Sequence, residues 1–280
     1  MENICNAGID IGSTTVKLVI CDGGEIVFSR YRRHQALTVD TVRTLLTEAL
    51  ETLGNRVMDP AFTGSAGMGV AEAFGFPFVQ EVVASTKLIR QKWPDVRTLI
   101  EIGGEDSKIA FFDDHFQPDI RMNGNCAGGT GTFIEQMAVL LNVPLDDFDR
   151  MVGESRALHP IASRCGVFAK TDIQALLSNR VSREDIAASV FHAMALQVIS
   201  TLARGCDVRE KVLFAGGPLT FFPRLCEAFV RLLHLDREKG VAACAHPELV
   251  AAEGAALYHG DAPCRVALEK CVQILSLIHI

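Results

Sequence analysis

Two cysteines, Cys126 and Cys165, stand in short polar or glycine-rich stretches that each precede an apolar-periodic helix. Cys126 lies in Asn-Gly-Asn-Cys-Ala-Gly-Gly-Thr-Gly-Thr (123–132), and Cys165 lies in Ser-Arg-Cys-Gly (163–166). Unpaired N–H groups and the macrodipole at a helix N-terminus favour negative charge, so a thiolate forms more easily there and binds a metal more readily. Two cysteines supply only half of a four-thiolate site, so one chain alone does not complete such a site.

The remaining cysteines give no further metal or disulfide pattern. The chain has nine cysteines, an odd number, and no Cys-x-x-Cys pair, which favours neither a disulfide framework nor a zinc ribbon. The default for each is a small buried hydrophobe, and Cys21, at the end of an apolar run, fits that default.

A second kind of chemistry is indicated near the N-terminus, in the stretch Asp-Ile-Gly-Ser-Thr-Thr-Val-Lys (10–17). A tight turn with small hydroxyl residues offers backbone N–H and side-chain O–H groups to phosphate oxygens, and Asp10 at the strand end could hold Mg²⁺ directly or through water. An ordinary hairpin with a buried aspartate fits this motif equally well. The candidate phosphate-binding residues are Gly12, Ser13, Thr14, Thr15 and Lys17.

The second half of the chain repeats this order. A strand ending at Ile102 and containing Glu101 leads into the turn Gly103-Gly104-Glu105-Asp106, and the returning strand contains Lys108. Duplicated lobes with facing phosphate hairpins would produce this echo. Further on, Gly216 and Gly217 follow an apolar strand and permit close approach of a flat ligand such as a nucleoside. No P-loop or Rossmann glycine pattern occurs.

These motifs are carried by alternating strands and helices, so we expect an α/β protein. The opening is a β-meander over residues 7–33, and the main helices are expected at 38–53, 82–93, after each cysteine motif, at 182–204 and at 249–258. Ser182 is the expected N-cap of the long helix, with Asp185 at capping-box distance. The expected division is a first lobe (1–85), a second lobe (86–262) and an incomplete C-terminal segment (263–280).

Composition bounds the class of protein. The chain has 280 residues, 49% of them hydrophobic and 22% charged, with a net charge of −7, which is ordinary for a globular protein and disfavours a nucleic-acid partner. No uninterrupted apolar run reaches the roughly 18 residues that a spanning helix needs, and the N-terminus lacks a signal-peptide pattern. We therefore expect a cytoplasmic protein without a membrane partner. Residues 275–280 resemble a translated sequencing adapter and are predicted to be artefactual.

The motifs at 10–17, 101–108 and 216–218, in this order and spacing, resemble those of the actin, hexokinase and heat-shock chaperone ATPases. The two cysteine motifs narrow the resemblance to the activators of 2-hydroxyacyl-CoA dehydratases (component A) and their benzoyl-CoA reductase relatives, the BadF/BadG/BcrA/BcrD type. The resemblance covers about residues 5–260. It is closest to the first module of the long fused members, because of motifs such as Tyr31-Arg-Arg-His34.

The resemblance implies a homodimeric ATPase that binds ATP or ADP with Mg²⁺ and shares one [4Fe–4S] cluster between subunits. It implies Cys126 and Cys165 as cluster ligands, Gly103 and Gly104 as phosphate-binding, and Gly216 and Gly217 as adenosine-binding. Its implied catalytic residues are Asp10, Glu101, Glu105 and Asp106. The shorter activators usually carry Asp in place of Glu101 and Gln in place of Glu105.

The function expected on this basis is an ATP-hydrolysing iron–sulfur electron donor. It would take electrons from a ferredoxin or flavodoxin and activate a radical acyl-CoA dehydratase or reductase component. Two alternatives remain at this point: a small-molecule kinase of the amino-sugar type on the same fold, and a nucleotide-sensing module of a longer polypeptide. The paired cysteines count against the kinase.

Overall fold

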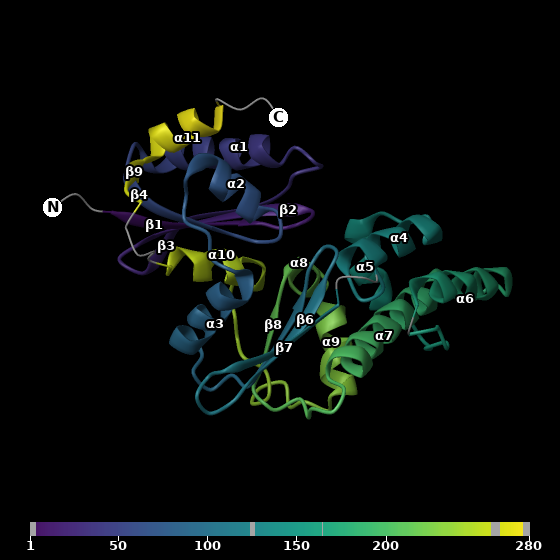
Figure 1. Cartoon of the computed structure of the whole chain (residues 1–280). Helices are drawn as coiled ribbons and strands as arrows, with labels where there is room; N and C mark the ends of the chain where they lie inside the picture. The colour runs from purple at the N-terminus through teal and green to yellow at the C-terminus, as the bar shows by residue number, and fades with distance from the viewer. Residues whose placement is uncertain (1–3, 124–126, 164, 259–263, 277–280) are drawn as a thin grey trace. The chain divides into compact units, whose positions relative to one another are not determined.

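The computed structural model describes residues 4–123, 127–163, 165–258 and 264–276 (Figure 1). Its packing divides the chain into two units: residues 1–94 together with 248–280, and residues 95–247. This grouping differs from the expected lobes, because the segments 86–94 and 248–262 belong to the first unit. The physical reason is packing: a helix from the first of these segments lies against a helix from the second, which in turn lies against the first sheet.

The first unit is built on a five-stranded sheet with the order β3-β2-β1-β4-β9. β1 pairs antiparallel with β2 and parallel with β4, β2 pairs antiparallel with β3, and β9 pairs antiparallel with β4. The strands are β1 (Cys5–Ile11), β2 (Thr15–Asp22), β3 (Glu25–Arg33), β4 (Val57–Thr63) and β9 (Val266–Ala267). The expected opening meander is confirmed.

Helices cover both faces of this sheet: α1 and α11 pack together on one face, and α3 and α10 pack together on the other (Figure 1). The helices are α1 (Thr38–Leu53), α2 (Gly67–Phe74), α3 (Glu81–Lys92), α10 (Val250–Ala256) and α11 (Leu268–Ser276). Small residues let α10 approach closely: a Cβ on Gly8 would lie 1.8 Å from the Ala252 carbonyl oxygen, and one on Gly254 would lie 2.1 Å from that of Ala84.

The second unit is built on a four-stranded sheet with the order β7-β6-β5-β8. β5 pairs antiparallel with β6 and parallel with β8, and β6 pairs antiparallel with β7. The strands are β5 (Thr98–Ile102), β6 (Ser107–Phe112), β7 (Pro118–Asn123) and β8 (Val212–Ala215). This is the arrangement of β3-β2-β1-β4 in the first unit, so the internal echo seen in the sequence is a duplication of sheet topology.

The helices of the second unit are α4 (Gly131–Leu141), α5 (Leu145–Val152), α6 (Gly166–Ser178), α7 (Arg183–Leu202), α8 (Gly217–Phe221) and α9 (Pro223–Leu232). The long core helix α7 packs against α4, α5, α6 and α9. Ser182 caps α7 as expected, accepting the Asp185 N–H at 3.2 Å. By length and composition α7 could span a membrane, but 67% of its most apolar window is buried, as suits a core helix.

Several elements were not expected from the sequence: β7, α5, α9, β9 and α11. Each is short or carries mixed polarity, so periodicity alone marks it weakly. In α11 the buried residues Leu268, Cys271 and Leu275 share one face and join the core of the first unit. Leu275, the first residue of the stretch predicted to be artefactual, therefore continues this face, while residues 277–280 lie outside the described part of the chain.

Candidate functional site

The first hairpin joins β1 to β2 through a tight turn. The Gly12 N–H donates to the Thr15 carbonyl at 2.9 Å, which closes the turn. One step back along the strands, Asp10 and Lys17 are cross-strand neighbours, and the Lys17 ammonium lies 2.8 Å from Asp10 Oδ2. Asp10 is only 2% exposed. The salt bridge between Asp10 and Lys17 therefore holds both side chains in place next to the turn.

The electrostatics of this pair favour its charged form. Burial alone would lower the pKa of Lys17, but the adjacent Asp10 carboxylate outweighs it and holds the pKa above its ordinary value. Lys17 therefore stays protonated at neutral pH and presents a positive charge beneath the turn. This arrangement suits the binding of phosphate oxygens above it.

Two residues of β4 and its exit complete the surroundings of Asp10, and sequence analysis did not select them. Thr63 pairs with Asp10 in the parallel register, and its buried hydroxyl makes no hydrogen bond within the described structure. Gly64 has a φ of +89°, and a Cβ there would lie 2.3 Å from Asp10 Oδ1 and 2.4 Å from the Ile11 carbonyl oxygen. A Thr-Gly pair ending a strand beside the acid-bearing strand is the signal that could have found them.

His34, which follows β3, is hydrogen-bonded to the turn of the first hairpin. Its backbone N–H donates to the Thr14 carbonyl at 3.1 Å, and its Nδ1 accepts from the Ala36 N–H at 3.1 Å. Because Nδ1 is the acceptor, a neutral ring carries its proton on Nε2, which lies 3.2 Å from the Gly12 carbonyl oxygen and donates to it. His34 thus gives the Tyr-Arg-Arg-His motif a local structural role.

The second hairpin, between β5 and β6, repeats this geometry. The Gly103 N–H donates to the Asp106 carbonyl at 2.9 Å. Glu101 and Lys108 are cross-strand neighbours, as Asp10 and Lys17 are in the first unit. The Lys108 ammonium lies 3.1 Å from Asp106 Oδ2 and 3.8 Å from Glu101 Oε1. Glu101 and Asp106 therefore converge on one buried lysine, whereas Glu105 is exposed at the tip of the turn.

The paired glycines 216 and 217 lie beside the end of β5. Gly216 has a φ of +91°, and a Cβ there would lie 2.1 Å from the Ile102 carbonyl oxygen. Its N–H donates to the Pro247 carbonyl at 3.0 Å. The candidate adenosine-binding residues and the second hairpin are thus neighbours within one unit.

The N-terminus of α4 is attached to the second hairpin. The N–H of Gly131 donates to the Gly103 carbonyl at 2.9 Å, and both the N–H and the hydroxyl of Thr132 donate to the Gly104 carbonyl at 2.8 Å. α4 begins at Gly131, near the end of the glycine-rich stretch, and its first two N–H groups donate to the hairpin carbonyls. Cys126 itself lies outside the described residues.

Cys165 is the N-cap residue of α6 and is partly exposed. The backbone amides of Phe168 and Val167 hold the pKa of its thiol below the usual value, as expected at a helix start. A Cβ on Gly166 would lie 3.8 Å from the Gly128 backbone nitrogen. The segments that follow the two cysteines are therefore side by side. Within the described residues, no three His, Cys, Asp or Glu side chains form a group able to hold a metal ion.

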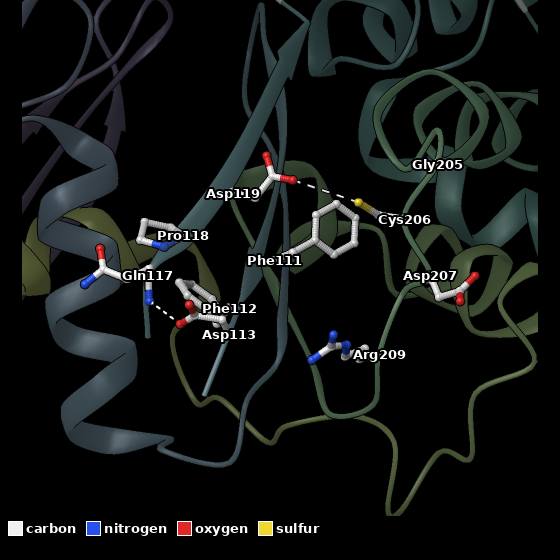
Figure 2. A pocket seen from close by; sticks show the side chains of 10 residues that line it. All are labelled: Phe111, Phe112, Asp113, Gln117, Pro118, Asp119, Gly205, Cys206, Asp207 and Arg209. Carbon is white, nitrogen blue, oxygen red and sulfur yellow. Dashed lines mark hydrogen bonds between the residues drawn. The ribbon is translucent and has the colours of Figure 1, made fainter. Parts of the chain in front are cut away.

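A further cavity of about 570 Å³ lies at the opposite end of β6 from the second hairpin (Figure 2). Within it, Cys206 Sγ lies 3.9 Å from Asp119 Oδ2 and 2.9 Å from the Arg121 guanidinium. None of the residues selected from the sequence lines it. The lining residues are Phe111, Phe112, Asp113, Gln117, Pro118, Asp119, Gly205, Cys206, Asp207 and Arg209.

Two units with the same sheet topology, each carrying a glycine hairpin with a buried acid–lysine pair, have the actin, hexokinase and heat-shock chaperone ATPase fold. More narrowly, the chain belongs to the BadF/BadG/BcrA/BcrD ATPase family, whose model matches residues 7–259. The (R)-2-hydroxyglutaryl-CoA dehydratase activating ATPase of Acidaminococcus fermentans is 33% identical over 218 residues, which cover 77% of this chain and 83% of that protein.

Solved structures agree with this assignment. The crystal structure of the Acidaminococcus fermentans (R)-2-hydroxyglutaryl-CoA dehydratase component A matches with a TM-score of 0.81 at 27% identity, over 95% of this chain and 98% of that one. The activator of the 2-hydroxyisocaproyl-CoA dehydratase from Clostridium difficile, solved with bound ADPNP, matches with a TM-score of 0.76 at 26% identity, over 99% and 98% of the two chains.

The crowding at Gly64 yields a stability prediction. Gly64→Ala should destabilise the protein by about 1–3 kcal/mol more than Gly75→Ala, because overpacking adds to the strain of a left-handed backbone. Gly75 has a φ of +70° but open space where its Cβ would stand, so it is the matched control. Urea unfolding of both variants measures the difference, and equal losses would show that the contact with Asp10 is unimportant.

The helix-start position of Cys165 yields a reactivity prediction. In cluster-free protein kept without oxygen, iodoacetamide should alkylate Cys165 with a pH midpoint below the roughly 8.5 of an ordinary thiol. Cys264 is also partly exposed, but burial and the nearby Asp59 raise the pKa of its thiol, so it is the control. Peptide mapping across pH 6–10 should show Cys165 reacting at lower pH than Cys264; the reverse order contradicts the prediction.

Proposed function

We propose that this protein is an ATP-hydrolysing iron–sulfur electron donor that activates a 2-hydroxyacyl-CoA dehydratase or a benzoyl-CoA-reductase-like partner. Its membership of an ATPase family supports the nucleotide half of the proposal. The observation that carries the coupling is the attachment of α4 to the second hairpin through the carbonyls of Gly103 and Gly104. A change at a phosphate-binding turn thereby reaches the segment that bears Cys126.

In this proposal both hairpins bind ATP phosphates. The first turn offers the hydroxyls of Ser13, Thr14 and Thr15, the glycines of the second turn let phosphate approach the backbone, and Lys17 supplies positive charge beneath the first turn. Asp10 would hold Mg²⁺ through water, since its Oδ2 already pairs with Lys17, and the buried Thr63 hydroxyl is a further polar atom beside it. The acids of the second hairpin are Glu101 in β5 and Glu105 and Asp106 in the turn, with Gly216 and Gly217 next to adenosine.

The cysteines fit a shared cluster. Cys165 stands at a helix start that favours its thiolate, and the segment after Cys126 runs beside the segment after Cys165. Cys126 and Cys165 would hold a [4Fe–4S] cluster, which supplies one-electron chemistry when bound. Such a cluster is held by four thiolates, so a second copy of the chain would bring the other two. Val167 and Phe168 are strongly exposed beside Cys165 and suit burial in such a homodimer.

The energetics are adequate for the role. Moving one electron through 100 mV takes about 2.3 kcal/mol, and a switch that inverts a two-state population from 1:99 to 99:1 requires about 5.5 kcal/mol. A ligand-driven switch of that size could therefore raise the reducing power of an electron received from a ferredoxin or flavodoxin. The relatives named as dehydratase activators support an acyl-CoA dehydratase as the acceptor. The proposal also places the protein in the cytoplasm, without a nucleic-acid or membrane partner.

The nucleotide half predicts slow Mg-ATP hydrolysis without any small-molecule acceptor. Asp10→Asn should reduce this turnover and should also cost about 3–5 kcal/mol of stability, because it leaves the Lys17 ammonium, whose side chain is only 15% exposed, without its carboxylate. Asp40→Asn breaks an exposed pair with Arg43 and should cost at most about 1 kcal/mol. Phosphate release and urea unfolding measure both effects. A phosphorylated sugar or acid as product would favour a kinase instead.

The cluster half predicts about two iron and two sulfide per chain after anaerobic purification, with the loaded protein eluting as a dimer. Cys126→Ser and Cys165→Ser should each abolish the cluster, while Cys21→Ala should retain it, since Cys21 is buried in the first unit. Iron and labile-sulfide analysis decides the matter. A wild-type protein that purifies without iron under these conditions, and cannot be reconstituted, overturns this half of the proposal.

A further inference from the structure

Gln197 lies on the core helix α7, and its side chain is only 6% exposed. Its Nε2 donates a 2.9 Å hydrogen bond to the carbonyl oxygen of Gly128. Gly128 is the second residue after Cys126 in the chain. A buried amide on the core helix therefore binds the backbone of the segment that leads from Cys126 into α4.

The hydrogen bond between Gln197 and the Gly128 carbonyl requires glycine at position 128. A Cβ on Gly128 would lie 2.7 Å from both Nε2 and Oε1 of Gln197, so any side chain there would displace the amide. Gly166, which follows Cys165, packs against the segment that contains Gly128, with its Cβ position 3.8 Å from the Gly128 nitrogen. Gln197 therefore binds the backbone where the segments that follow the two cysteines are in contact.

The segment 127–132 is held at its other end as well. Thr130 folds it into a turn, because both its N–H and its hydroxyl donate to the Ala127 carbonyl, at 3.1 and 2.6 Å. Gly131 and Thr132 then donate to the carbonyls of the second hairpin. The segment is therefore fixed to α7 at one end and to the hairpin at the other, with only a tight turn between.

We propose that Gln197 is a positioning residue: by binding the Gly128 carbonyl, it fixes the segment that follows Cys126 in the chain beside Gly166, which follows Cys165. This inference rests on the proposed cluster-binding function and names a residue outside its ligand set. Groups that orient ligands in this way influence metal affinity through geometry. Loss of the donor would leave the buried Gly128 carbonyl without this hydrogen bond, and the segment would shift to satisfy it.

The test compares Gln197→Met, which keeps the length of the side chain but removes the donor, with Ser189→Ala. Ser189 is also a buried polar residue of α7, and its hydroxyl accepts a hydrogen bond from the His159 N–H at 2.8 Å. This bond does not involve the segment of Gly128. Gly128→Ala is a second variant, which disturbs the same contact from the other side. All are measured in the full chain.

Two readouts are used. In cluster-free protein, iodoacetamide alkylation mapped by peptide should show the ratio of Cys126 to Cys165 reactivity changed several-fold in Gln197→Met and Gly128→Ala, and unchanged in Ser189→Ala. In reconstituted protein, iron release to a chelator should be about 10–100-fold faster in the same two variants.

The inference is overturned if Gln197→Met matches wild type in both readouts. It is also overturned if Gln197→Met raises the alkylation of buried Cys5 and Cys271 as much as that of Cys126, since that pattern marks general loss of structure. If wild type holds no iron, the proposed function fails by itself, while the alkylation ratio still decides whether Gln197 positions Cys126.

Discussion

No side chain caps the N-terminus of α4, and the structure around the site depends on the backbone carbonyls that accept its first N–H groups instead. The first N–H groups of any helix need acceptors, and here they are the carbonyl oxygens of Gly103 and Gly104. The acceptors belong to the turn that carries the candidate phosphate-binding residues Gly103 and Gly104. A turn that serves both partners cannot move without either breaking helix-capping bonds or taking the helix with it, and this makes α4 an extension of the second hairpin.

The duplicated hairpins show how strongly this geometry is constrained. In each, a glycine N–H closes the turn on the carbonyl three residues ahead, and an acid–lysine pair lies across the strands below it. The two hairpins differ in the residues of the turn itself. The first turn carries hydroxyl residues and is held by His34, whereas the second carries two acids and holds a helix. The same backbone geometry thus carries hydroxyl side chains in one unit and the N-terminus of a helix in the other.

Much of this was predictable because it is local. The pairing of Asp10 with Lys17 and of Glu101 with Lys108 follows from the length of each turn once the hairpins are recognised, and the meander and α1 follow from periodicity. Gly64 and Gln197 were not predictable, because each acts on a backbone atom far away in sequence. The acceptors for the first N–H groups of α4 were not predictable either, since they are hairpin carbonyls that lie 28 residues earlier in the chain.

The order in which the two units appear along the chain has a consequence for biosynthesis. The second unit is one uninterrupted segment, residues 95–247, whereas the first is assembled from both sides of it. Domains generally fold as units during synthesis. The second unit can therefore form its core on the ribosome while β1 still lacks α10 and β4 still lacks β9. The hairpin that carries Asp10 is made first but acquires its complete support last.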